Sequence, residues 1–199
     1  MKCPRCGSKN VAEILYGMPA FDDELEARIE LGKVRLGGCC VTDHDPRFHC
    51  NKCHSDFGYP PAITTKTGSE DLRDVITSIH FSVGGYFEGH QEIWFKKSGD
   101  TVSYSLTAFP NYAEANNVVI SKREWQTLLD KLFCKLCVHE WKKRYNDPCV
   151  LDGEQWELQF KLTRGRLRTY HGCNAYPPLW AELRRVFQPY FKKYSEVQN

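Results

Sequence analysis

The sequence predicts an α+β fold in which a small cysteine-rich module precedes an antiparallel sheet with two long helices packed on one face. Three observations carry this prediction. Six of the ten cysteines fall before residue 58, the apolar positions that follow alternate mostly with the period of strands, and two segments carry apolar residues at helical spacing. Because strands and helices occur in separate runs, the helices are expected to cover one side of the sheet.

Composition supports a folded core and limits the setting of the chain. The 199 residues are 41% hydrophobic and 13% aromatic, and 27 basic residues nearly balance 25 acidic ones. No stretch is long and apolar enough to predict a membrane-spanning helix, and the N-terminus lacks the apolar run of a secretion signal. We therefore expect a cytoplasmic protein, in which cysteines act as ligands, core residues or free thiols rather than disulfides.

The first module is expected to span residues 1–58. Val11–Tyr16 is predicted as a strand, Phe21–Leu31 as a short acidic helix ended by Gly32, and Val34–Val41 as a further extended segment. Phe21, Leu25 and Ile29 are expected on one face of this helix.

A polar segment rich in Pro and Gly, residues 59–71, is expected to link this module to a second domain, residues 72–199. That domain should start with a strand over Val75–Val83. A hairpin should follow, with strands over Gln91–Lys97 and Thr101–Ala108.

The two long helices are expected in the second half of the chain. Ser121 with Glu124 forms a capping-box pattern, and the apolar stripe that follows predicts a helix that runs to about Tyr145. The last helix should begin after Pro177-Pro178, with a kink or break at Pro189. Between them, strands are predicted over Gln155–Leu162 and Arg166–His171, joined by a turn at Arg164-Gly165.

Two C-x-x-C pairs predict one metal site. Cys3 and Cys6 form the first pair, and Cys50 and Cys53 form the second. Four thiolates favour zinc, which binds sulfur in a tetrahedral shell. Such a shell leaves no place for water, so the zinc is expected to be structural rather than catalytic. Gly7 suits the turn after the second cysteine, because that turn favours a positive φ.

Other ligands and a second site remain open alternatives. A nearby side chain could replace one cysteine of the site; the candidates are Cys39, Cys40, His44, His49 and His54. A further C-x-x-C pair, Cys134 with Cys137, lies within a predicted helix and lacks the Gly or Pro of a metal-binding turn. We therefore favour core roles for this pair and for His139, Cys149, His171 and Cys173.

Dense polar and aromatic segments flank the predicted hairpin. Their residues suit turns and the start of a helix, which is the simpler structural interpretation. The functional interpretation is a ligand pocket at one edge of the sheet, lined by Asp152, Trp156, His171, Asn174 and Tyr176.

Basic residues on the hairpin offer a phosphate-binding surface. Arg164, Arg166 and Arg168 would share one face of a regular strand. Such a row is more often a solvated face, so nucleic acid is the weaker expectation for a partner.

Two sets of motifs carry a resemblance. Cys3-Pro4-x-Cys6-Gly7, Leu36-Gly37-Gly38-Cys39 and His49-Cys50-x-x-Cys53 resemble the N-terminal zinc-ribbon module of small uncharacterised bacterial proteins. Asp152-Gly153-x-Gln155-Trp156-x-Leu158 and Gly172-x-Asn174-Ala175-Tyr176-Pro177 are similar to a C-terminal pattern in other uncharacterised bacterial proteins. The resemblance implies a bacterial, cytoplasmic setting and a bound zinc, and it implies no reaction.

The sequence thus favours a non-catalytic zinc-ribbon protein, with one structural zinc and an α+β domain that docks an unknown protein or small ligand. The first alternative is a nucleic-acid-binding accessory protein that uses the ribbon and the basic hairpin. The second is an enzyme with a site near Asp152, His171, Asn174 and Tyr176.

Overall fold

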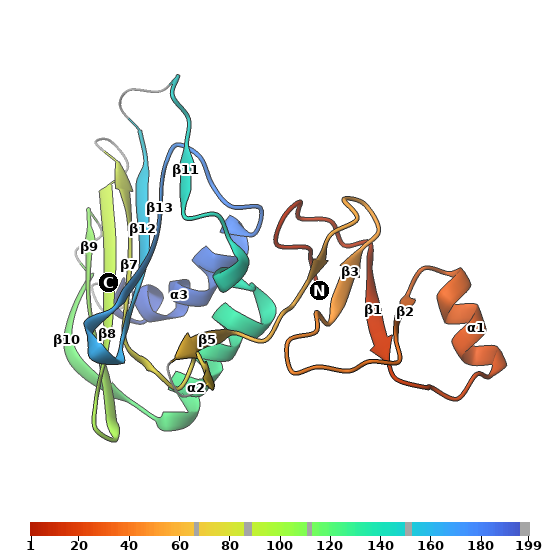
Figure 1. Ribbon diagram of the computed structural model, residues 1–199. Coiled ribbons are helices and arrows are strands. Elements are labelled where there is room, and N and C mark those ends of the chain that lie inside the picture. Colours follow the sequence, from red (N-terminus) through yellow and green to blue (C-terminus); the bar gives the residue numbers. More distant parts are fainter. Residues whose placement is uncertain (66–67, 86–88, 111–112, 150–152, 196–199) are drawn as a thin grey trace.

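The structure is a computed structural model, and it describes residues 1–65, 68–85, 89–110, 113–149 and 153–195. Figure 1 shows three layers: a large twisted sheet, a layer of helices on one of its faces, and a small N-terminal module beyond the helices. The fold is α+β with mainly antiparallel strands, as the sequence predicts.

The N-terminal module is built on a small four-stranded sheet in the order β2-β1-β3-β4. Its strands are β1 (Val11–Tyr16), β2 (Val34–Gly38), β3 (Phe48–Cys50) and β4 (Asp56–Phe57). β1 has the predicted bounds. It pairs parallel with β2 and antiparallel with β3, so the cysteine of β3 is held beside the start of β1.

The acidic helix α1 (Asp23–Glu30) connects β1 to β2 and begins later than predicted. Asp22 caps it, because its carboxylate accepts a hydrogen bond from the Leu25 amide at 2.8 Å. Leu25 is the buried residue of α1, whereas Phe21 precedes the helix and is exposed. The predicted apolar face is therefore wrong at Phe21. Gly32 follows the helix end with a φ of +64°.

The segment predicted as a linker contains regular structure. β5 (Ala62–Thr65) and β6 (Gly68–Asp71) pair as an antiparallel two-stranded sheet. The Leu72 amide donates a hydrogen bond to the Pro61 carbonyl at 2.6 Å, which closes the base of this hairpin.

The large sheet has seven strands in the order β10-β9-β8-β7-β12-β13-β11. All neighbouring pairs are antiparallel except β11 with β13. The bounds are β7 (Ile76–Gly85), β8 (Gly89–Ser98), β9 (Thr101–Phe109), β10 (Ala113–Ile120), β11 (Arg144–Asn146), β12 (Gln155–Leu162) and β13 (Leu167–Cys173). β12 has the predicted bounds, whereas β10 and β11 were not predicted.

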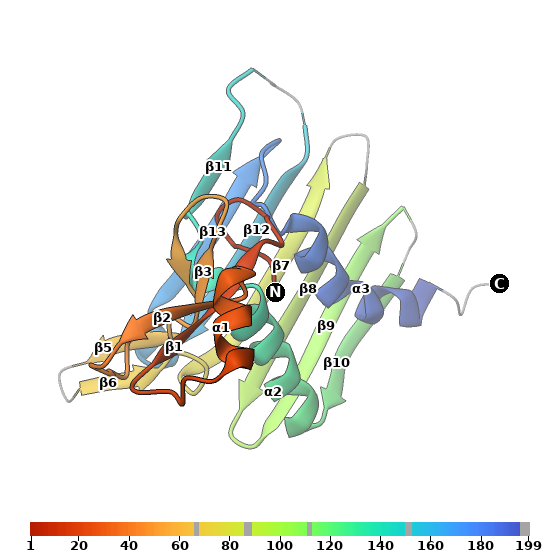
Figure 2. The same ribbon diagram turned by 90° about the vertical axis from the view of Figure 1, so that its right-hand side faces the viewer.

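One face of the large sheet is apolar and the other is polar. On β9, for example, Val102, Tyr104 and Leu106 are buried, while the residues between them point to the opposite face. The apolar face packs against the helices, where Phe81 stacks on Phe187 with ring centroids 4.5 Å apart. Figure 2 views the sheet from the side of the helices. On the opposite, polar face no helix of the described residues is present (Figure 1).

The first of the two predicted long helices is wrong in length. α2 (Lys122–Asp130) begins at the predicted cap, where Ser121 Oγ accepts from the Glu124 amide at 3.1 Å, but it has nine residues. The chain then forms a π-helical turn (Lys131–Lys135) and reverses at Cys137, whose φ is +49°. A left-handed residue cannot continue a right-handed helix, so a 3₁₀ turn (Val138–Glu140) and β11 follow.

The second helix is long. The sequence predicts a kink or a break at Pro189. α3 (Trp180–Ser195) continues through Pro189, so a break is absent from its described residues. Proline removes one backbone donor. The apolar stripe that includes Leu183, Phe187 and Phe191 stays buried against the sheet on both sides of Pro189, and this packing holds the helix together.

Candidate metal centre

Two short loops of the N-terminal module share one hydrogen-bonding pattern. In the first loop, the Cys3 amide donates to the Ser8 carbonyl at 2.9 Å, and the Gly7 amide donates to the Cys3 carbonyl at 2.9 Å. In the second, the Cys50 amide donates to the Ser55 carbonyl at 2.9 Å, and the His54 amide donates to the Cys50 carbonyl at 2.8 Å. The module therefore presents two matched knuckles.

The residue after the second cysteine of each knuckle is left-handed. Gly7 has a φ of +71° and its counterpart His54 has a φ of +55°. Glycine adopts this conformation without steric cost, as the sequence predicts for Gly7, whereas histidine adopts it only at some cost. His54 is exposed and does not belong to the group of four cysteines whose ligand atoms are close enough to share an ion.

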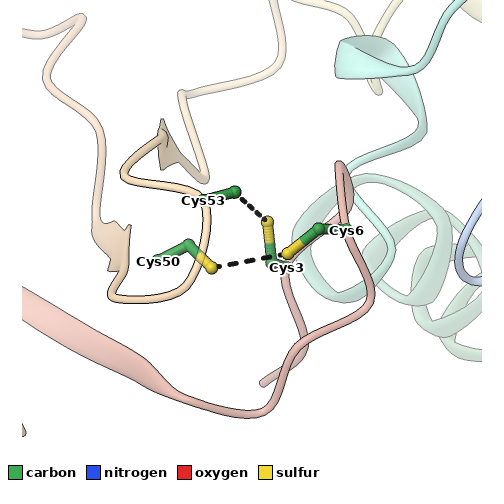
Figure 3. Close-up of side chains that lie close together, drawn as sticks. All are labelled: Cys3, Cys6, Cys50 and Cys53. Atoms are coloured by element: carbon green, nitrogen blue, oxygen red, sulfur yellow. Dashed lines mark hydrogen bonds between the residues drawn. The ribbon is translucent and has the colours of Figure 1, made fainter.

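The two knuckles bring four sulfur atoms together (Figure 3). The Sγ atoms of Cys3, Cys6, Cys50 and Cys53 all lie within 4.8 Å of one another. Across the knuckles, Cys3 and Cys53 are 3.7 Å apart and Cys6 and Cys50 are 3.6 Å apart. A tetrahedral zinc with Zn–S bonds of ~2.3 Å separates its sulfurs by ~3.8 Å. The spacing of these sulfurs therefore suits a metal of that size.

The protonation of the thiols would change when a metal binds. Burial raises the pKa of Cys3 to about 12, whereas hydrogen bonding from the Ser55 hydroxyl is the main cause that lowers the pKa of Cys53 to about 6. Burial thus favours the protonated form of Cys3, and the Ser55 hydrogen bond favours the thiolate of Cys53. A metal that takes all four sulfurs must displace the proton of Cys3, so its affinity will fall with falling pH.

The alternative ligands lie outside this cluster. In the described part of the chain, the four cysteines are the one group of three or more metal-ligating side chains close enough to share an ion. Cys39, Cys40 and His44 are exposed. His49 is buried, but its Nδ1 lies 2.5 Å from the Asp56 carboxylate and 2.6 Å from the Arg35 guanidinium.

The residues considered for a second site are dispersed. Cys134 lies beside the Arg73 guanidinium at 3.3 Å, and Cys149 is exposed. His171 and Cys173 are on β13. Cys137 is buried against Cys3, Cys50 and Phe57, and it therefore belongs to the packing of the metal site without being one of its four sulfurs.

The N-terminal module is attached to the helix layer by contacts that the sequence did not reveal. The Glu140 carboxylate accepts from the Gly58 amide at 2.8 Å and from the Tyr59 amide at 3.0 Å. His139 Nε2 lies 2.9 Å from the Tyr59 carbonyl, and Lys2 pairs with Glu182 of α3. The module therefore packs on the second domain at several points.

The two C-terminal segments that carry the resemblance pack against each other. Trp156 is buried, and its indole Nε1 donates to the Ala175 carbonyl at 2.9 Å. The Asn174 amide donates to the Glu154 carbonyl at 2.9 Å, and a Cβ at Gly153 would lie 1.8 Å from the Asn174 side chain. Both segments thus have a structural role.

A cavity of about 870 Å³ opens near these segments on the polar face of the sheet. Trp156 and His171, predicted for a ligand pocket, line it, whereas Asn174 and Tyr176 are not among its lining residues. Asp152 lies outside the described residues, although Gly153 lines the cavity.

A histidine–carboxylate cluster beside this cavity was missed by sequence reasoning. His80 is 8% exposed, and its Nε2 lies 2.8 Å from Glu92 Oε1 while its Nδ1 lies 3.3 Å from Glu157 Oε1. Its ring stacks on Trp94 at 3.7 Å between centroids. These residues come from three neighbouring strands and share no sequence motif, so only the sheet register brings them together.

The basic hairpin differs from the regular strand on which the predicted phosphate surface depends. Arg164 lies in a 3₁₀ turn with a φ of +67°, Arg166 follows that turn, and Arg168 is on β13. Arg166 and Arg168 line a smaller cavity of about 290 Å³ together with Trp141 and Tyr170. The three guanidinium groups therefore do not form one regular row.

Comparison with protein-family models, curated proteins and solved structures finds no match for this chain. Among the described residues, no helix is long and apolar enough to cross a membrane.

Proposed function

We propose that the protein binds one zinc ion with Cys3, Cys6, Cys50 and Cys53, and that this ion has a structural role. The observation that carries the proposal is that two knuckles with the same hydrogen-bonding pattern bring four Sγ atoms within 4.8 Å of one another. Four thiolates fill a tetrahedral shell, so no position is left for a reacting water or substrate.

The small core of the N-terminal module supports a structural role for the metal. The buried cluster around the site consists of Cys3, Cys50, Phe57 and Cys137, so three of its four members are cysteines. The other buried apolar residues in the described part of the module are Ala12, Ile14, Leu25 and Val34. This is a small core, and metal binding would add to its free energy of folding.

We further propose that the α+β domain docks a partner or small ligand and is non-catalytic. The cavity on the polar face supports a ligand, because His171, Glu157 and Gln155 present hydrogen-bonding groups around it. The enzyme alternative now has a specific observation in its favour, the contact of His80 with Glu92 and Glu157. The described partners of that imidazole are these two carboxylates and not a serine or cysteine, so a nucleophile–base pair is not supported.

The bacterial and cytoplasmic setting remains part of this proposal and rests on the motif resemblance. The nucleic-acid alternative loses support at the hairpin, because Arg164 and Arg166 precede the strand that should align them with Arg168.

Metal analysis of protein purified without added zinc tests the proposal. We expect about one zinc per chain, with four thiols that react with a thiol reagent only after a chelator is added. Cys149→Ser is the matched control, because Cys149 is exposed and distant in sequence from the site, and this variant should keep its zinc. Protein without metal, or a Cys50→Ser variant that keeps a full zinc equivalent, would overturn the four-cysteine site.

A further inference from the structure

A cleft lies where the N-terminal module meets the helix layer. It has a volume of about 870 Å³ and is distinct from the cavity on the polar face of the sheet. Its floor is apolar, formed by Leu136, Leu179 and Val186, which are all less than 10% exposed. The helix side comes from the π-helical turn and α3, and the other side comes from the residues that flank the first knuckle.

The cleft concentrates positive charge. Five basic side chains and one carboxylate line it: Lys2, Lys9, Lys131, Lys135, Arg185 and Glu182. The cleft thus has an excess of four positive charges, whereas the formal net charge of the whole chain is +2. The remainder of the chain is therefore slightly acidic, and the positive potential of this cleft is a local feature.

Three of these charges have no counter-ion among the described residues. Lys2 pairs with Glu182, and Arg185 lies 4.0 Å from the same carboxylate. In the described part of the chain, no carboxylate lies within ion-pair distance of Lys9, Lys131 or Lys135. Cations that face one cleft without compensation repel one another, so this arrangement favours an anion between them.

The π-helical turn is a second, independent observation at the same place. The Leu136 amide donates to the Lys131 carbonyl at 3.0 Å, a bond that spans five residues in place of the usual four. Such turns are rare and occur frequently at functional sites. This one places Lys131, Lys135 and Leu136 together on the wall and floor of the cleft.

We propose that this cleft binds an oligophosphate, that is, a ligand with two or more linked phosphate groups. Several lysines from separate elements act as point charges, and together they suit a multiply charged anion better than they suit a single carboxylate. The apolar floor leaves room for a hydrophobic group attached to the phosphates. The proposal rests on the proposed function for Lys2 and Lys9, because the zinc would hold the loop between them in place, whereas Lys131 and Lys135 lie on the π-helical turn.

Titration calorimetry with inorganic tripolyphosphate tests the proposal. The wild-type protein should bind the probe at low ionic strength, and binding should weaken as salt is added. The double variant Lys131→Gln/Lys135→Gln should bind more than tenfold more weakly, since each lost charge near a phosphate contributes a factor of about four. The matched control, Lys96→Gln/Lys97→Gln, removes two exposed lysines of β8 outside the cleft and should stay within about twofold of wild type.

Binding of equal strength in the two double variants would overturn the proposal, as would no binding by the zinc-loaded wild type. Zinc content measured after each titration separates this proposal from the structural one. Zinc-free protein whose binding still depends on Lys131 and Lys135 would refute the zinc site and keep the cleft. Zinc-loaded protein that does not bind tripolyphosphate would refute the cleft proposal and keep the zinc site.

A single-stranded decanucleotide without terminal phosphates identifies the source of the phosphate. If it competes with tripolyphosphate and binds more tightly, the ligand is a nucleic-acid backbone. If it does not compete, the ligand is a free oligophosphate. Both results require the tripolyphosphate binding on which the proposal depends.

Discussion

The replacement Gly172→Ala tests whether the two C-terminal segments hold each other in place. Gly172 is on β13, opposite Trp156 of β12. A Cβ at Gly172 would lie 2.3 Å from Trp156 Nε1 and 2.5 Å from the Ala175 carbonyl oxygen, the two atoms that form the indole hydrogen bond. The added methyl group therefore cannot be accommodated unless this bond is broken or the strand moves.

The expected loss of stability is the sum of two effects. Overpacking a dense core costs about 1–3 kcal/mol. Loss of a buried hydrogen bond costs about 1–3 kcal/mol when a partner is left unsatisfied. Trp156 is only 2% exposed, so water cannot easily replace the Ala175 carbonyl. We expect a fall of about 2–6 kcal/mol in the free energy of unfolding and a fall of about 4–24 °C in Tm.

Thermal and urea unfolding, followed by near-ultraviolet circular dichroism, measure this effect. Gly85→Ala is the matched control, because its φ is not positive and the nearest atoms to its added Cβ lie at 3.4 Å, an ordinary contact. It should change the free energy of unfolding by less than about 1 kcal/mol. Trp156→Phe should cost less than Gly172→Ala, since it removes the hydrogen bond without overpacking. The reasoning is refuted if Gly172→Ala and Gly85→Ala have equal stability.

Three further predictions concern the metal module and its attachment. The Cys50→Ser variant should lose zinc, and the amides of residues 1–58 should lose their protection in hydrogen exchange while those of residues 72–199 keep theirs. If exchange also rises throughout residues 72–199, the module and the second domain do not fold separately. Gly7→Ala should cost about 1–2 kcal/mol in chemical unfolding because of its positive φ, since its added Cβ meets Pro178 only at an ordinary 3.6 Å; an unchanged midpoint would contradict this. Burial lowers the pKa of His139 in the folded protein. The neutral imidazole therefore contributes fully to stability above the unfolded pKa of about 6.5, and this contribution is lost as the pH falls from that value through the lower folded pKa. His139→Gln should therefore lose less stability than wild type between pH 7.5 and 5.5, and parallel curves for the two proteins would exclude that role.

Local patterns in the sequence were sufficient for the metal cluster and for several strands. Two C-x-x-C pairs predicted the four cysteines that the structure brings together, because each pair forms its knuckle from neighbouring residues alone. β1 and β12 were predicted with their observed bounds, since alternation and flanking turn residues define a strand locally. The helix start at Ser121 was likewise evident from its cap.

Tertiary structure decided where the apolar stripe after Ser121 stops being helical. Its apolar spacing continues to Trp141, which is indeed buried, but Cys137 is left-handed and the chain turns there. The reversal lets Trp141 Nε1 donate to the Leu136 carbonyl at 3.0 Å and lets Cys137 pack against the metal module. Periodicity records which residues are buried, and it does not distinguish one long helix from a helix followed by a turn.

The sites that combine distant segments were also beyond the reach of the sequence. His80, Glu92 and Glu157 meet because of strand register, and the basic cleft exists because the N-terminal module packs beside the π-helical turn. The sequence by itself determined the chemistry of the candidate metal centre, since its four cysteines lie in two short motifs. Only the fold decided which isolated charges share a surface, because electrostatic and hydrogen-bonding contacts depend on distances that sequence separation does not set.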